Sequence, residues 1–215
     1  MINVGSQRIA NIIPNGFITT RGNKDDKVLY LTFDDGPNDL YTTRVCDLLE
    51  QFDAVGSFFC IGQNLERHPE IAKNLTDRGH LIANHSDTHD KFRQQKLVTQ
   101  IQEAESCQSR ILKLNPSSRK IFRAPQADLD IFLMCKLLSR KWNLIHWSYD
   151  SLDYKHKTVD YYLELFENKP VKNGDILLFH DDNSLCLEIL ELMLPIWKNL
   201  NFEFKSVDRL LSQDV

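Results

Sequence analysis

Residues 27–37 read KVLYLTFDDGP, and this stretch decides the fold. Its first seven residues are mostly apolar and rich in Val, Leu, Tyr and Phe, which predicts a buried strand over 27–33. The next four residues, Asp34-Asp35-Gly36-Pro37, end that strand, because Asp, Gly and Pro all favour turns. The chain therefore has a buried strand that ends in two adjacent carboxylates.

Short apolar runs alternate with longer segments of helical period in the rest of the chain. Further strands are predicted over 56–61, 80–84, 120–123, 144–148, 175–179 and 202–204. Helices are predicted over 42–52, 69–78, 94–114, 130–140, 158–167, 185–199 and 207–211. Such alternation predicts βαβ units, and seven or eight strands in one domain of 215 residues favour a closed or nearly closed barrel. We therefore expect an α/β fold, a single-domain, distorted (β/α) barrel with mostly parallel strands that can be incomplete.

The composition excludes several classes of protein. Lys and Arg number 26 against 30 Asp and Glu, a net charge of −4, without the clustered positive surplus of a nucleic-acid binder. The longest apolar runs are far shorter than the ~20 residues that span a bilayer, so we expect no transmembrane segment. No apolar stretch of signal-peptide length opens the sequence, and we therefore expect a cytoplasmic location.

The five cysteines are odd in number and widely spaced, and most lie in apolar stretches. A free cysteine in such a stretch behaves as a small apolar residue. The pattern favours reduced thiols in the core, with a disulfide framework or a Cys-rich metal site as the alternatives.

Polar side chains directly follow most of the predicted strands. In a parallel barrel the loops after the strands open on one face, where catalytic groups gather. Each of these side chains is also unfavourable to bury without a partner. They are Asp34, Asp35, His85, His89, Arg123, Asp150, Asp153, His180 and Asp181.

Taken one at a time, these residues have ordinary explanations. Asp-Asp-Gly-Pro is common turn chemistry, in which Asp bonds its own backbone and Gly takes a positive φ. His85 and His89 are close enough in the chain to share a cation, but a protein with seven histidines can contain such a pair by chance. His180, after an apolar strand, also fits a histidine at the edge of the core. Only together do they indicate one site.

Five short motifs, in this order, resemble those of the polysaccharide deacetylases of the NodB-homology type, carbohydrate esterase family 4. The first two are highly specific, and the last three gain weight from their order. They are Thr32 to Pro37 (T-F-D-D-G-P), His85 to His89 (H-[ST]-x-x-H), Arg123 to Pro125 (R-x-P), Asp150 to Asp153 (D-x-x-D) and Leu178 to His180 (L-x-H). The resemblance implies an N-terminal lead-in over 1–26 and a NodB-like catalytic domain over 27–215.

The resemblance also implies a metal-dependent hydrolase that removes an N-acetyl or other N-acyl group from an amino sugar or a glycan that contains one. By this resemblance, Asp35, His85 and His89 would hold a divalent ion. Two imidazoles and one carboxylate suit Zn²⁺, with Co²⁺ or another first-row ion as alternatives. Such an ion polarises the acyl carbonyl and lowers the pKa of its bound water.

Proton-transfer roles follow from the same resemblance. Asp34 would be the general base, oriented and kept ionised by Arg123. His180 would be the general acid, with Asp153 bound to its other ring nitrogen and raising its pKa. The backbone N–H of Gln126 would help to hold the oxyanion.

Two places depart from the family pattern. R-x-P is usually followed by an aromatic residue and Gly, where this chain has Gln126 and Ala127, and D-x-x-D is usually followed by Trp, where it has Tyr154. These positions fall on the expected walls of the substrate groove, so we expect altered subsites or a non-polymer substrate. The alternative substrates are an O-acetyl ester, a lipid-linked formamido sugar or a small cyclic amide. An inactive sugar-binding module is the alternative from another class of protein.

Overall fold

The computed structural model describes residues 17–155 and 157–211 of the chain. Within these residues, eight strands belong to one sheet. The strands are β1 (Val28–Asp34), β2 (Gly56–Cys60), β3 (Leu81–Asn84), β4 (Ile121–Phe122), β5 (Asn143–Leu144), β6 (Tyr149–Asp150), β7 (Ile176–His180) and β8 (Glu203–Phe204). The helices are α2 (Thr42–Gln51), α3 (Gly62–Arg67), α4 (Pro69–Asp77), α5 (Leu97–Leu114), α6 (Ile131–Leu138), α7 (Val159–Asn168) and α8 (Ser184–Asn199). Four 3₁₀ turns are η1 (Phe92–Gln94), η2 (Pro125–Ala127), η3 (Asp153–Lys155) and η4 (Val207–Leu210).

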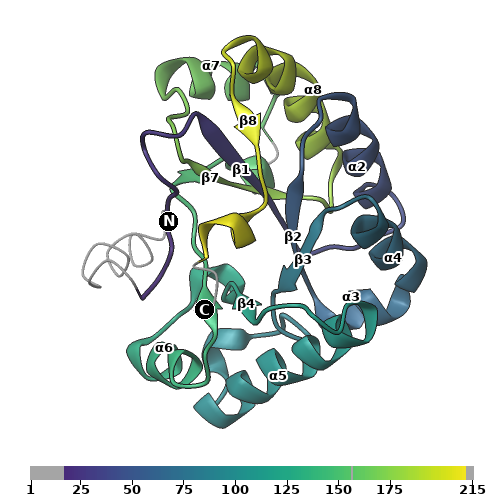
Figure 1. Ribbon diagram of the computed structural model, residues 1–215, viewed down its shortest axis with the longest axis vertical. Coiled ribbons are helices and arrows are strands. Elements are labelled where there is room, and N and C mark those ends of the chain that lie inside the picture. Colours follow the sequence, from purple (N-terminus) through teal and green to yellow (C-terminus); the bar gives the residue numbers. More distant parts are fainter. Residues whose placement is uncertain (1–16, 156, 212–215) are drawn as a thin grey trace.

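The sheet is a curled, parallel barrel that stays open along one side. Its strand order is β5-β4-β3-β2-β1-β7-β6, and β8 pairs with the first two residues of β1. All of the pairings between these strands are parallel. Figure 1 shows the helices on the outside of the curl, with the strands around the middle of the molecule. The expected distorted, incomplete (β/α) barrel is therefore confirmed.

One predicted strand is wrong. Residues 144–148 do not form a single strand; they separate β5 from β6, which lie at opposite ends of the strand order. The apolar run gave no sign of this break, because a run of this length looks the same whether or not its residues share one neighbouring strand. Helix α3 was also missed, since six residues are too few to show helical periodicity.

The described end of the lead-in packs into the open side of the barrel. Thr19 forms a parallel bridge with Ile145, and its N–H donates to the carbonyl oxygen of Leu144 at 2.8 Å. Two residues later, Arg21 forms an antiparallel bridge with Asp175, and its guanidinium lies 2.6 Å from the Asp175 carboxylate. The lead-in thus bonds to the chain beside β5 and to the chain beside β7.

The interior of the barrel is apolar at one end and polar at the other. Alternate side chains of a strand point to opposite faces, so Val28, Tyr30, Thr32 and Asp34 of β1 share the inner face. Val28 and Tyr30 belong to an apolar cluster with residues from β2, β3, β7 and η4. The members of this cluster are Val28, Tyr30, Phe59, Ala83, Ile121, Ile145, Ile176 and Val207. Going along β1, the inner face changes from this cluster to Thr32 and then Asp34, at the end where the loops carry the polar motifs.

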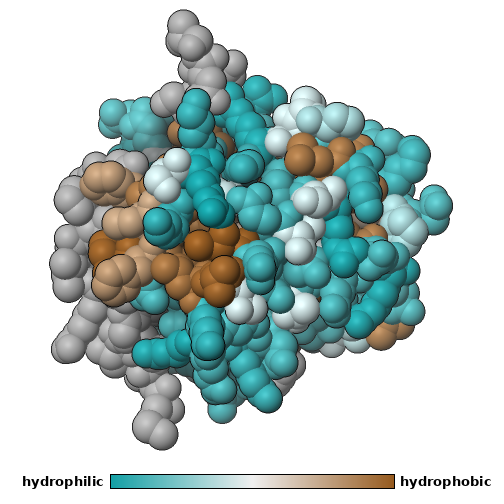
Figure 2. Space-filling model, turned by 90° about the horizontal axis from the view of Figure 1, so that it is seen from below, coloured by the Kyte–Doolittle hydropathy of each residue, from teal (hydrophilic) through white to brown (hydrophobic). Residues whose placement is uncertain are grey.

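Helices α5 and α6 bury one face each and leave apolar side chains on the other. Ala104 and Leu133 are fully buried between these helices and the sheet. Val98 and Phe132 are instead 60% and 70% exposed. Figure 2 shows the apolar surface on this side of the molecule, where these two helices lie lowest in Figure 1.

The cysteines are free thiols, and four of the five are buried as the sequence predicted. Cys46, Cys60, Cys107 and Cys186 are free and buried, whereas Cys135 is free and exposed. Among the described residues, none of the helices combines the length and the apolar character that a bilayer crossing requires.

Replacing Arg21 with Ala should lower the free energy of unfolding by about 1–3 kcal/mol, because a hydrogen bond to a buried charged group is lost. The Asp175 side chain is only 2% exposed, so water does not replace the guanidinium. Urea denaturation measures the change, with Lys24→Ala, an exposed lysine three residues later, as the matched control. Equal stability of the two variants would show that the contact between Arg21 and Asp175 does not stabilise the fold.

Candidate active site

Asp34 and Asp35 are neighbours in the chain but have different partners. Asp34 is the last residue of β1, and its side chain shares the inner face of the barrel with Thr32. Asp35 has left the strand and has a φ of 78°, a left-handed conformation. Both carboxylates reach Nε2 of His85 at 3.6 Å, but Asp34 also bonds Arg123, whereas Asp35 lies near His89. The Nδ2 of Asn64 on α3 donates to the carbonyl oxygen of Asp35 at 2.8 Å and holds this turn. Two adjacent carboxylates can therefore take different roles.

Asp35, His85 and His89 bring three ligand atoms together, all within 4.8 Å of one another. The Asp35 Oδ1 lies 3.6 Å from Nε2 of His85 and 3.4 Å from Nε2 of His89. In His85 the other ring nitrogen, Nδ1, bonds the carbonyl oxygen of Arg123 at 2.9 Å, which leaves Nε2 free to bind. Burial, together with the neighbouring His85, lowers the pKa of His89 and favours the neutral imidazole that binds metals.

A metal ion fits this cluster. The Asp35 Oδ1 is buried and has no hydrogen-bond partner among the described residues. A buried carboxylate oxygen without a partner is costly unless something positive binds it. Two imidazoles and one carboxylate are the donor set of many first-row metal sites, and they leave positions open for water and substrate. The structure brings these three side chains together, and their role as metal ligands stays a prediction.

Arg123 crosses the barrel interior to meet Asp34. One of its terminal nitrogens lies 2.6 Å from Asp34 Oδ1 and 2.8 Å from the hydroxyl of Thr32. The guanidinium also lies 4.0 Å from the centre of the Phe59 ring, a close cation–π contact. Burial by itself would raise the pKa of Asp34, but the charges of Arg123 and His85 outweigh it and hold that pKa below its ordinary value. The carboxylate is therefore ionised at neutral pH.

His180 and Asp153 form a second coupled pair at the same end of the barrel. Nδ1 of His180 lies 2.8 Å from Asp153 Oδ1, and its backbone N–H donates to Oδ2 at 2.7 Å. Burial by itself would lower the pKa of His180, but the bond to the Asp153 carboxylate and that negative charge raise it to about 10. His180 therefore carries a proton at neutral pH, with Nε2 as its other donor.

The residues at the two departures from the family pattern lie beside these pairs. Tyr154 is 46% exposed, its ring centre is 5.5 Å from that of His180, and its hydroxyl donates to Asp150 at 3.3 Å. Gln126 is exposed and has a φ of 53°, and Ala127 has a φ of 58°. Two successive left-handed residues, neither of them Gly, put strain into the loop that follows Arg123.

Asp150 and Asp181, two of the polar residues that follow predicted strands, lie outside the metal cluster, and Thr32 and Phe59 were not predicted as site residues. Asp150 acts within its own loop, where it accepts the N–H of Leu152 at 2.9 Å. Asp181 is fully buried beneath the Asp35 turn and accepts the hydroxyl of Thr42 at 2.5 Å. Thr32 could have been found from its place in the first motif, whereas nothing in the local sequence marks Phe59. Residues 155–157 read KHK, a basic stretch whose central residue lies outside the described residues.

Replacing Ala127 with Gly should raise the free energy of unfolding by up to about 1 kcal/mol. The left-handed conformation costs an ordinary residue roughly 1–2 kcal/mol, and the extra freedom of Gly in the unfolded chain takes back about 0.4–1 kcal/mol. Urea denaturation measures the difference. Ala72→Gly, in the middle of α4, is the control and should lower stability by about 1 kcal/mol; a loss of similar size in both variants would contradict the strain.

The sequence of this chain is similar to those of known deacetylases. The family described as polysaccharide deacetylase matches residues 21–132. A peptidoglycan-N-acetylglucosamine deacetylase of Bacillus cereus is 32% identical over 209 residues, which is 92% of this chain and 94% of that protein. A chitooligosaccharide deacetylase of Rhizobium leguminosarum bv. trifolii is 31% identical over 167 residues, with 73% of each chain covered.

The fold is also similar to that of a solved deacetylase structure. The crystal structure of the Bc1960 peptidoglycan N-acetylglucosamine deacetylase has a TM-score of 0.83 at 21% identity and covers 91% of this chain and 92% of that chain. That likeness concerns the fold alone, but the sequence matches extend over most of the chain. The chain belongs to the polysaccharide deacetylase family of hydrolases.

Proposed function

We propose that this protein removes the N-acetyl group from an amino sugar of a glycan by metal-assisted hydrolysis. The observation that carries the proposal is the cluster of Asp35, His85 and His89, whose ligand atoms lie within 4.8 Å of one another, beside the ionised Asp34. The relatives described above are named for N-acetylated substrates, which supports the substrate class. A cytoplasmic location stays a prediction from the sequence.

Zn²⁺ is the ion that we propose for the cluster, since two imidazoles and one carboxylate suit it, and Co²⁺ fits the same donors. When bound, such an ion polarises the amide carbonyl and makes water more acidic. Asp35, His85 and His89 would hold it, and the roles of the remaining residues follow from their own contacts.

Asp34 is the proposed base. Its Oδ1 is occupied by Arg123, and its Oδ2 faces Nε2 of His85 at 3.6 Å, on the side of the metal cluster. A carboxylate held ionised and fixed in one orientation can take the proton of the attacking water. Arg123 is then a positioning residue, because its bonds to Asp34 and Thr32 set that orientation.

His180 is the proposed acid. The carbon–nitrogen bond breaks only if the leaving amine receives a proton, and the pKa of about 10 keeps one on His180 at neutral pH. Asp153 holds Nδ1, so the remaining proton of the ring lies on Nε2, the nitrogen that Asp153 does not bind. The products are acetate and the free amino sugar.

Gln126 and Tyr154 are the proposed substrate contacts. Both are exposed beside the site, and we propose that the backbone N–H of Gln126 donates to the oxyanion. Tyr154 offers a half-exposed ring next to His180, where a sugar can stack. An inactive sugar-binding module would not need an ionised base and a protonated acid facing one metal cluster, so the geometry favours the enzyme.

The test is acetate release from N-acetylated chitooligosaccharides and from peptidoglycan, with and without a metal chelator. Activity should disappear with the chelator and return with Zn²⁺ or Co²⁺. Asp34→Asn should lower kcat by about 10²–10⁴-fold, the usual contribution of a positioned base, and should still bind Zn²⁺. Asp39→Asn, an exposed aspartate in the same turn, is the matched control. Full activity in the presence of the chelator would overturn the proposal.

The pH profile tests His180 separately. Because Asp153 raises the pKa of His180, the acid stays protonated as the pH rises, until the pH passes the folded pKa of about 10. In Asp153→Asn, burial acts without the opposing charge, so the alkaline limb of kcat/KM should move to lower pH by about one to three units. Asp182 is an exposed aspartate two residues after His180, and Asp182→Asn should leave the pH of the alkaline limb unchanged. An unmoved limb in Asp153→Asn would rule out this acid.

A further inference from the structure

Helix α5 packs against the loop that carries the two histidines, and the Glu103 carboxylate of this helix binds that loop. Oε2 of Glu103 accepts the backbone N–H of Asp87 at 3.1 Å and the backbone N–H of Thr88 at 2.7 Å. It also accepts the hydroxyl of Thr88 at 2.9 Å. Asp87 and Thr88 are two of the three residues between His85 and His89. Three donors of this segment therefore bond to a single oxygen of Glu103. This residue belongs to none of the five family motifs.

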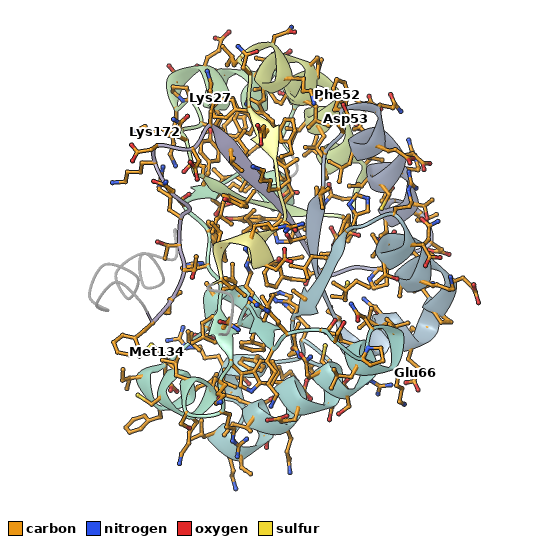
Figure 3. The ribbon with its side chains drawn as sticks, in the orientation of Figure 1. Lys27, Phe52, Asp53, Glu66, Met134 and Lys172 are labelled. Atoms are coloured by element: carbon orange, nitrogen blue, oxygen red, sulfur yellow. The ribbon has the colours of Figure 1, made fainter. Side chains whose placement is uncertain are left out.

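Two other groups on the same face of α5 bind the loop within and after the histidine segment. Arg110, seven residues after Glu103, donates from Nε to the Asp87 carboxylate at 2.8 Å and from a terminal nitrogen to Glu66 of α3 at 2.5 Å. Figure 3 labels Glu66, where α3 runs beside α5. Gln100 donates to the carbonyl oxygen of Phe92 at 2.9 Å, after the second histidine. Three polar side chains of α5, those of Gln100, Glu103 and Arg110, thus contact the loop.

The histidine loop needs such support because its backbone is strained. Ser86 has a φ of 67° and His89 a φ of 61°, both left-handed. Each such residue costs roughly 1–2 kcal/mol unless other contacts compensate. Hydrogen bonds to an ionised carboxylate are about twice as strong as neutral ones, and those of Glu103 fix the two residues that connect the strained positions. Since Arg123 already holds the His85 ring through Nδ1, the bonds of Glu103 act on where His89 lies relative to that ring and to Asp35.

We propose that Glu103 is a positioning residue for the metal site, which pre-sets the distance between the His85 and His89 rings without binding the ion. Its Oε2 is occupied by the loop, and it is absent from the cluster of ligand atoms that the described residues form. The proposal rests on the proposed function, since it concerns the same metal cluster. The proposal adds a residue to those that the five motifs supply for metal binding. This residue is a glutamate about two turns after the start of α5.

The test is metal affinity, which needs no substrate. Zn²⁺ is titrated into the metal-free full chain in competition with a chromogenic chelator, and Co²⁺ is titrated with its visible absorption spectrum as the readout. Glu103→Ala should weaken Zn²⁺ binding about 10–100-fold, the usual cost of losing a group that orients a ligand, and should change the Co²⁺ spectrum. Glu103→Gln keeps an acceptor oxygen and should recover most of the affinity. The backbone amides of Asp87 and Thr88 should exchange hydrogen faster in Glu103→Ala.

Glu105→Ala is the matched control. Glu105 lies on the same helix, but it only meets Lys120 and Arg140, at 3.8 and 3.6 Å, so it should leave Zn²⁺ affinity unchanged. If Glu103→Ala does not fold, Thr88→Val removes one of the three bonds and should weaken Zn²⁺ binding by a smaller factor. Wild-type affinity and an unchanged Co²⁺ spectrum in Glu103→Ala would overturn this inference alone. Zn²⁺ binding that is equally tight in His89→Ala would instead overturn the proposed metal site, and the inference with it.

Discussion

The buried ion pair between Arg123 and Asp34 is the interaction on which the rest of the structure depends. Both side chains are almost fully buried, and an unpaired charge in such a place costs several kcal/mol. Arg123 also contributes its carbonyl oxygen to Nδ1 of His85, so one residue orients both the carboxylate of β1 and a ring that follows β3. The metal cluster and its neighbouring carboxylate therefore share one anchor. A barrel interior filled only with apolar side chains, as at the other end, could not supply it.

Proposed catalytic and metal-binding groups of the site are oriented by hydrogen bonds with a second group. Asp153 bonds both the ring and the backbone of His180, and the Glu103 carboxylate bonds the segment between the two histidines. Each holding group lies in a different loop or helix from the group that it holds. Catalytic precision in this protein thus comes from contacts between elements rather than from the motifs themselves, which agrees with the general need to fix reacting groups closely.

Most of the fold was accessible from local patterns. The apolar run of β1, the alternation with helices and the turn after Phe33 predicted the elements and the parallel sheet correctly. The errors share a cause. The split between β5 and β6 depends on which strand each half meets, and α3 is too short to repeat its pattern. Glu103 was missed for a similar reason, because a glutamate in an amphipathic helix looks like any solvent-facing residue until the loop beside it is seen.

The sequence by itself determined the types of elements, the chemical groups and their order along the chain. The structure extends β1 to Asp34, one residue beyond the predicted strand, and this places Asp34 on the inner face with Tyr30, because alternate strand residues share a face. Only the tertiary structure decided that positions 35, 85 and 89 converge within 4.8 Å, and that the barrel is open where Thr19 enters. Such convergence depends on strand register, sheet curl and left-handed turns such as that of Asp35, and these are set by contacts between residues far apart in the chain.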